Sequence, residues 1–130
     1  MQKKMSFTVS STVITPAMIE ARLKELSHQV DEAHSELQEA ESHYNSIKAH
    51  YEIALAKTRL NLARRTSPSG KNYTVGERED LAIIENEDLH LRMSTAETLV
   101  KSARANAQRI RTQVDIARSI GTSVRVSMEL

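Results

Sequence analysis

Apolar side chains recur at alternating steps of four and three residues over two long stretches of the chain. A side chain that recurs every three or four residues stays on one face of an α-helix, and a strict seven-residue period is typical of a coiled-coil seam. The pattern therefore predicts two long helices, each of which needs a helical partner. The first seam is Ile19, Leu23, Leu26, Val30, Ala33, Leu37, Ala40, Tyr44, Ile47, Tyr51, Ala54 and Thr58, and the second is Leu89, Met93, Ala96, Val100, Ala103, Ala107, Ile110, Val114 and Ala117.

The limits of both helices are marked by capping and turn residues. Thr15 is a suitable N-cap and Pro16 suits the first helical position, so a helix is predicted over 16–65. The stretch 66–72 is rich in turn formers, and Thr74-Val-Gly-Glu77 has the spacing of a capping box. A second helix is predicted over 75–120, with Gly121 as its stop.

The fold class expected from these elements is all-α. Two helices of similar length joined by a short polar turn pack antiparallel, so residues 15–120 are expected to form one long helical hairpin. Residues 1–14 and 121–130 form separate end segments. Both alternate β-branched and polar residues as strands do, but Gly121, Val124 and Met128 also continue the helical phase, so strand and helix both remain open.

The distribution of charge supports the antiparallel arrangement. Residues 20–43 carry seven acids and two bases, whereas residues 98–125 carry six bases and one acid. The remaining halves of the two helices have the opposite bias. The heptad register predicts the ion pairs Lys48–Glu97 and Glu41–Arg104, and the same offset places Leu62 beside Ile83.

Composition favours self-assembly. The chain has no Trp and one Phe, and alanine occupies many seam positions, so a single hairpin buries little apolar area. A closed homo-oligomer larger than a dimer, with a ring suspected, is therefore expected. The alternative is that some off-seam apolar residues only widen the contact within one chain. Those residues are Leu55, Leu60, Leu62, Ile84, Leu91, Leu99, Ile116 and Ile120.

Several classes of protein are disfavoured by the sequence. Zero cysteines exclude disulfides and thiolate metal sites, and no segment approaches the ~20 apolar residues of a membrane span. We therefore expect a cytoplasmic protein without a membrane partner, located in the host cytoplasm if the chain is encoded by a phage.

Histidines supply the only metal-like spacings. Glu25…His28 and Glu87…His90 match the Glu-x-x-His spacing of di-iron bundles, but both histidines fall off the predicted seam and at opposite ends of the hairpin. His43 and His50 lie two helical turns apart, too far to hold one ion without a partner chain. We interpret the histidines as solvated, and expect no metal, no cofactor, no catalytic residue and no enzymatic activity.

Basic residues gather near the predicted turn and are the candidate binding site. Cations of this kind contact phosphates without sequence preference, and a neighbouring tyrosine stacks on a base. The alternative is that Lys and Arg only complement the dipole at a helix C-terminus. The candidate DNA-binding residues are Lys57, Arg59, Arg64, Arg65, Lys71 and Tyr73.

The same region resembles a known family. The run Ile53-Ala-Leu-Ala-Lys57-Thr-Arg59-Leu60 is followed by a Gly-containing polar turn, an aromatic residue and a helix that begins at Thr. This order is similar to the UvsY-type recombination mediator proteins of tailed phages. The resemblance implies a small helical protein that assembles into rings, binds single-stranded DNA and helps to load a RecA-like recombinase in exchange for a single-strand binding protein. It places the family's DNA-contacting motif on Lys57, Arg59 and Leu60.

The function expected from the sequence is therefore that of a phage recombination mediator. The rival hypothesis is a non-enzymatic coiled-coil scaffold or adaptor, or a phage inhibitor of a host protein. The net charge of +1 favours the rival, because it promises no bulk attraction to nucleic acid, whereas the basic motif favours the mediator.

Overall fold

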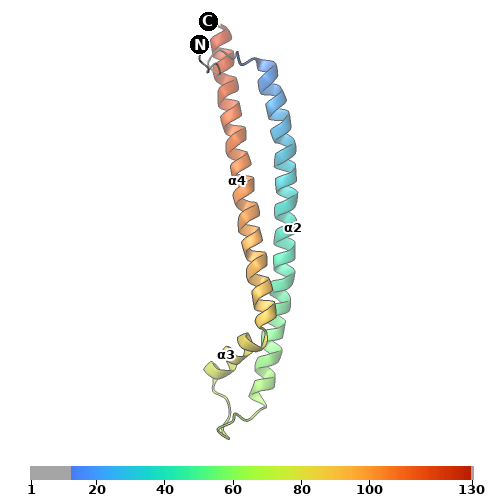
Figure 1. The fold of residues 1–130 in the computed structure, drawn as a ribbon, viewed down its shortest axis with the longest axis vertical. Helices are drawn as coiled ribbons and strands as arrows, with labels where there is room; N and C mark the ends of the chain where they lie inside the picture. The colour runs from blue at the N-terminus through green and yellow to red at the C-terminus, as the bar shows by residue number, and fades with distance from the viewer. Residues whose placement is uncertain (1–12, 130) are drawn as a thin grey trace, which may run out of the picture. The chain divides into compact units, whose positions relative to one another are not determined.

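The computed structural model describes residues 13–129, and these residues are almost entirely helical (Figure 1). The helices are α2 (Pro16–Ala63), α3 (Val75–Glu85) and α4 (Glu87–Glu129). The described residues contain no strand beyond an isolated antiparallel bridge between Thr66 and Asn72. The all-α prediction is confirmed. None of the described helices has an apolar stretch that would cross a bilayer.

Both predicted helix starts are present. The Thr15 hydroxyl accepts a hydrogen bond from the Met18 amide at 3.2 Å, and α2 begins at Pro16. At the start of α3, the Glu77 amide donates to the Thr74 hydroxyl at 3.1 Å, and the Glu77 carboxylate accepts from the Thr74 amide at 2.9 Å. This reciprocal capping box satisfies two backbone donors that a helix start leaves free.

The connection between α2 and α3 is a tight turn. The Ser67 amide donates to the Lys71 carbonyl at 2.8 Å, and the Gly70 amide donates to the Ser67 carbonyl at 2.9 Å. Gly70 has a φ of 81°, in the left-handed region where a side chain is unfavourable. The predicted turn therefore lies where the sequence placed it.

The chain divides into two compact units, and α2 and α4 contribute to both. The first unit combines the chain up to His34 with Asn106 onward, and the second is Ser35–Ala105. In both units, every seam position named above is buried or half-buried. The seven-residue pattern thus identified the contacting helix faces.

In the first unit, α2 and α4 meet through small and branched side chains. Ala33, Ala107 and Ile110 form a buried cluster, and Val30 packs against it. Further along, Ile19 of α2 lies against Gly121 of α4. The earlier α2 residue, Ile19, contacts the later α4 residue, Gly121, whereas Ala33 lies in the cluster with Ala107. The two segments are therefore antiparallel in this unit.

The second unit contains one of the two predicted ion pairs. Arg104 Nη2 lies 3.2 Å from Glu41 Oε2, as the heptad register requires. The structure gives no ion pair between Lys48 and Glu97. Leu62 was expected to be partly exposed, but only 1% of it is exposed. Ile83, which was predicted to lie beside Leu62, is exposed.

The predicted second helix is interrupted at Asn86. Asn86 ends α3 with φ −113° and ψ 30°, and α4 begins at the next residue. Its side-chain amide donates to Ala82 O at 2.8 Å and to the Thr58 hydroxyl at 3.0 Å. A single continuous helix over 75–120 was therefore wrong. The break is stabilised by a partner 28 residues away, which local pattern does not reveal.

The predicted end of the last helix was also wrong. α4 continues through Gly121 to Glu129, so the strand alternative for residues 121–129 is excluded. Gly121 does not cap the helix but allows close approach, because a Cβ there would lie 3.0 Å from Ile19 Cγ2. The N-terminal segment 1–12, for which strand or helix was left open, lies outside the described residues.

This close approach makes a testable prediction. In a chain that already carries Ile19→Ala, Gly121→Ala is expected to raise the free energy of unfolding by about 1 kcal/mol, because Ala favours helix over Gly. In the unmodified chain the gain will be smaller, since the new Cβ has to displace Ile19. Denaturant unfolding of the four proteins gives the coupling as a double-mutant cycle. Equal gains in both backgrounds would show that Ile19 does not restrict residue 121.

Candidate nucleic-acid interface

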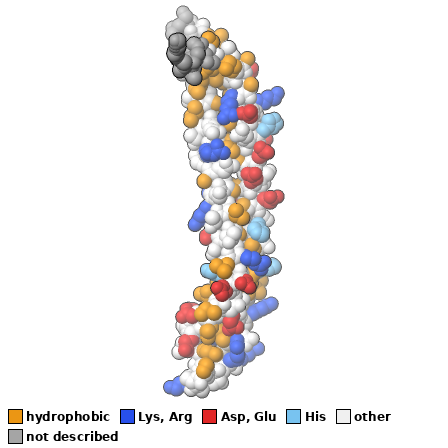
Figure 2. Space-filling model, viewed as in Figure 1, with side chains coloured by type: hydrophobic (Ala, Val, Ile, Leu, Met, Phe, Trp, Pro, Cys, Tyr) orange, Lys and Arg blue, Asp and Glu red, His pale blue; other side chains and the backbone are white. Residues whose placement is uncertain are grey.

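The predicted DNA-binding residues lie at the end of α2 and in the turn that follows, all within the second unit. Figure 2 shows Lys and Arg side chains in this region with Asp and Glu side chains beside them. All the cationic candidates are exposed, and Tyr73 is half-buried. Exposed cations at a helix end are available to phosphate oxygens, but the surrounding acids keep the local net charge low.

The two cations of the Lys-x-Arg-Leu motif do not share one side of α2. Two residues correspond to about 200° of rotation at 3.6 residues per turn, so Lys57 and Arg59 project to different sides of the helix. Arg64 follows Lys57 by seven residues and lies directly after Ala63, the last residue of α2. The backbone continues to turn there, since the Arg64 amide donates to Asn61 O at 3.1 Å. Lys57 and Arg59 therefore project from different sides of α2, and Arg64 belongs to the turn that follows.

Arg65 differs from the other candidates because it has a partner in the same chain. Its Nη2 lies 3.6 Å from Glu85 Oε2 at the end of α3. Both side chains are about half exposed, so the pair adds little stability. It does place a carboxylate beside this guanidinium, which weakens the attraction of Arg65 for a phosphate.

The turn residues Lys71 and Tyr73 are positioned by backbone contacts. The Lys71 carbonyl accepts a hydrogen bond from the Ser67 amide and so closes the tight turn. The Lys71 side chain is exposed. The Tyr73 carbonyl accepts from the Arg78 guanidinium at 3.1 Å. Arg78 was missed by the sequence reasoning. The sequence did contain an indication of this contact. Arg78 lies in the first turn of a helix, where the helix dipole disfavours a cation unless the cation has a partner.

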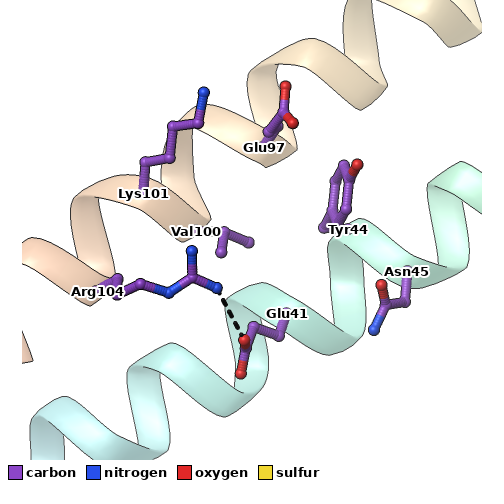
Figure 3. Close-up of a pocket in the computed structure, with 7 residues that line it drawn as sticks. All are labelled: Glu41, Tyr44, Asn45, Glu97, Val100, Lys101 and Arg104. Carbon is purple, nitrogen blue, oxygen red and sulfur yellow. Dashed lines mark hydrogen bonds and ion pairs between the residues drawn. The ribbon is translucent and has the colours of Figure 1, made fainter.

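A shallow groove of about 210 Å³ lies between α2 and α4 in the same unit (Figure 3). Val100 and Tyr44 contribute apolar surface, and the Glu41–Arg104 pair crosses one end. Asn45, Glu97 and Lys101 complete the lining. Two acids and two bases oppose one another here, so the groove has no strong preference for an anion or a cation.

His90 is not the solvated side chain that the sequence predicted. Its Nδ1 lies 3.2 Å from the Tyr51 hydroxyl, and the two ring centroids are 5.5 Å apart. Tyr51 is a buried seam residue of α2, so the pair forms part of the helix contact. The sequence feature that could have indicated this contact is that His90 directly follows the seam residue Leu89 and so lies at the edge of the buried helix face.

No group of three or more metal-ligating side chains occurs in the described part of the chain. Comparisons with protein families, with curated proteins and with solved structures find no match for this chain.

Proposed function

We propose that the protein binds single-stranded DNA through the basic residues at the end of α2 and assists the loading of a RecA-like recombinase. In this proposal the chain is a long helical hairpin that assembles into a closed oligomer. The observation that carries it is that Lys57 near the end of α2, Arg64 directly after the last helical residue and Lys71 in the following turn are all exposed. Arg59 supplies a cation on a different side of α2 from Lys57.

The mechanism that fits these residues is binding by many weak contacts. One copy offers only a few cations, and neighbouring acids reduce their effect. An oligomer repeats the same cations, so that after the first contact each further contact is intramolecular and has a high effective concentration. A strand held in this way remains single-stranded and accessible to a recombinase. No bond is made or broken in this role.

The test removes the cations of Lys57 and Arg64 and measures how the affinity for single-stranded DNA depends on salt. Each phosphate contact on a single strand contributes about −0.7 to the slope of log affinity against log salt. The double variant Lys57→Ala with Arg64→Ala is therefore expected to flatten the slope by about 1.4 per chain engaged, for oligonucleotides of any sequence. Fluorescence anisotropy at several salt concentrations gives both the affinity and the slope.

A matched control removes the same charge elsewhere. Lys24 on α2 and Arg118 on α4 are exposed in the first unit and form no ion pair with another described residue, and replacing both by Ala also lowers the net charge by two. This control is expected to leave the slope nearly unchanged. Equal losses in both double variants would mean a general charge effect, and no binding by the unmodified protein at ~50 mM salt, where such contacts are strongest, would reject the proposal.

A second candidate function is that of a non-enzymatic scaffold or adaptor. The observation that favours it is the number of large apolar side chains left exposed on α2 and α4, together with a net charge of +1. Exposed apolar residues arranged along helices are typical of surfaces that bind other helices. This candidate takes the place of the first if single-stranded DNA is not bound.

A further inference from the structure

A second apolar stripe follows α2 on the side away from its buried seam. We call it the outer stripe, and it lies entirely within the second unit. Its two large side chains are strongly exposed, Ile53 at 56% and Leu60 at 62%, and its alanines are exposed as well. The outer stripe consists of Ala49, Ile53, Ala56, Leu60 and Ala63.

The spacing of the outer stripe is that of a coiled-coil seam. Its members follow one another at steps of four, three, four and three, so Ile53 and Leu60 occupy heptad position a, and the three alanines occupy position d. An exposed helix face needs no such regular pattern. α2 therefore carries two seams, of which only one is covered by other helices in the described part of the chain.

We propose that the outer stripe packs against the outer stripe of a second copy of this chain, with the two α2 helices antiparallel. Side-chain size favours this direction. In an antiparallel pair, position a of one helix meets position d of the other, so Ile53 faces Ala56 of the second copy and Leu60 faces Ala49. Each of the four layers formed by these residues then combines one large and one small side chain, which fills space evenly, and Ala63 at the end of the stripe meets Ser46.

A parallel pair would pack the same residues poorly. Equal positions would meet, so that Ile53 faced Ile53 and Leu60 faced Leu60, and these wide layers would alternate with layers of alanine alone. The alanine layers would leave gaps, and cavities of this kind are costly. Size complementarity is therefore available to the antiparallel pair alone.

The charges beside the outer stripe favour the same direction. Glu52 and Arg59 follow one edge at heptad position g, and neither forms an ion pair with another described residue. In the antiparallel pair, Glu52 faces Arg59 of the second copy, and the two-fold symmetry repeats this attraction. A parallel pair would set Glu52 against Lys57 of the second copy but Arg59 against Arg64, so that a repulsion offsets each attraction. The stripe is thus complementary to itself in charge as well as in shape.

The other edge of the antiparallel pair contains no acid. Lys57 faces His50 of the second copy there, and Arg64 lies further along the same edge. The contact covers about two heptads and is smaller than a standard stable interface, so we expect association that depends on concentration in the micromolar range. This dimer does not rest on the proposed DNA binding, and either can fail without the other.

Disulfide crosslinking tests the direction, because the chain has no cysteine of its own. Leu60→Cys and Ala49→Cys are made as separate proteins, both at exposed positions that leave the fold intact. Each is incubated alone and in an equal mixture in a glutathione redox buffer, with one of them isotope-labelled for mass spectrometry. We expect the mixed disulfide in the mixture and little dimer from either protein alone.

The crosslinking has a built-in control and two contrary outcomes. Leu99→Cys, exposed on α4 and outside the stripe, mixed with Leu60→Cys gives the background from random collision. Self-linking of Leu60→Cys and of Ala49→Cys, each alone, would show a parallel pair and overturn the antiparallel assignment. Background levels in every mixture would overturn the proposed pairing of Leu60 with Ala49.

A charge exchange provides an independent measurement. Arg59→Glu places a carboxylate opposite Glu52 of the other copy in both of the symmetry-related pairs. It is expected to weaken dimerisation about tenfold in sedimentation equilibrium. Adding Glu52→Arg in the same chain restores both pairs with their charges exchanged, and is expected to recover most of the loss. No recovery would contradict the Glu52–Arg59 contact. DNA affinity is not the readout, so this result is separate from the test of function.

Discussion

Replacing Leu26 by Ala will lower the free energy of unfolding by about 2 to 5 kcal/mol. Leu26 is 0% exposed and is one of the two largest fully buried side chains in the described residues. Its removal loses the transfer free energy of the deleted carbons and leaves a cavity that neighbouring helices fill only in part. Chemical denaturation followed by circular dichroism at 222 nm gives the change directly.

The same substitution at an exposed position provides the control. Leu99 is 55% exposed, so Leu99→Ala removes the same atoms from a largely solvated site. It is expected to change stability by no more than about 0.5 kcal/mol, because surface substitutions seldom exceed that range. If both variants lost the same amount, the burial assigned to Leu26 would be wrong.

Enlarging the buried alanine Ala33 will also destabilise the protein, by about 1 to 3 kcal/mol. Ala33 is 2% exposed and belongs to the cluster with Ala107 and Ile110 across the helix contact. A leucine there has no space unless α2 and α4 move apart. The free energy of unfolding of Ala33→Leu measures the cost.

Ala21 is the matched control for this overpacking. It lies on the same helix and in the same unit, but it is exposed. Ala and Leu have similar helix propensities, so Ala21→Leu is expected to be nearly neutral. A stabilising effect of Ala33→Leu would mean that the helix contact is looser than the structure places it.

Sequence periodicity predicted the helices well because burial repeats with the helical turn. Tyr51, Ala96 and Val100 are buried where the seven-residue pattern placed them, and Thr15 and Thr74 cap helices as their local context predicted. Features that depend on distant partners were missed. Asn86 interrupts a helix and hydrogen-bonds to Thr58, which is 28 residues away. Gly121 lies within a helix, at a position where Ile19 leaves little room for a side chain.

The candidate site was predicted in composition but not in arrangement. The sequence identified the exposed cations near the turn, since charge and turn formers are local properties. It did not show that Arg65 is paired with Glu85, because that partner lies on a different helix. The outer stripe was also overlooked. Of its members only Leu60 was among the off-seam apolar residues considered, whereas the regular spacing of all five is the informative property.

The predominance of alanine in the helix contacts has a calorimetric consequence. Five of the ten buried apolar residues in the described part of the chain are alanines. The heat capacity increment of unfolding follows the apolar area that becomes hydrated, and is about 12 to 15 cal/mol/K per residue in ordinary globular proteins. A contact made with single methyl groups exposes less area, so its increment lies below that range. The stability curve of such a protein is therefore less strongly curved than that of an ordinary globular protein.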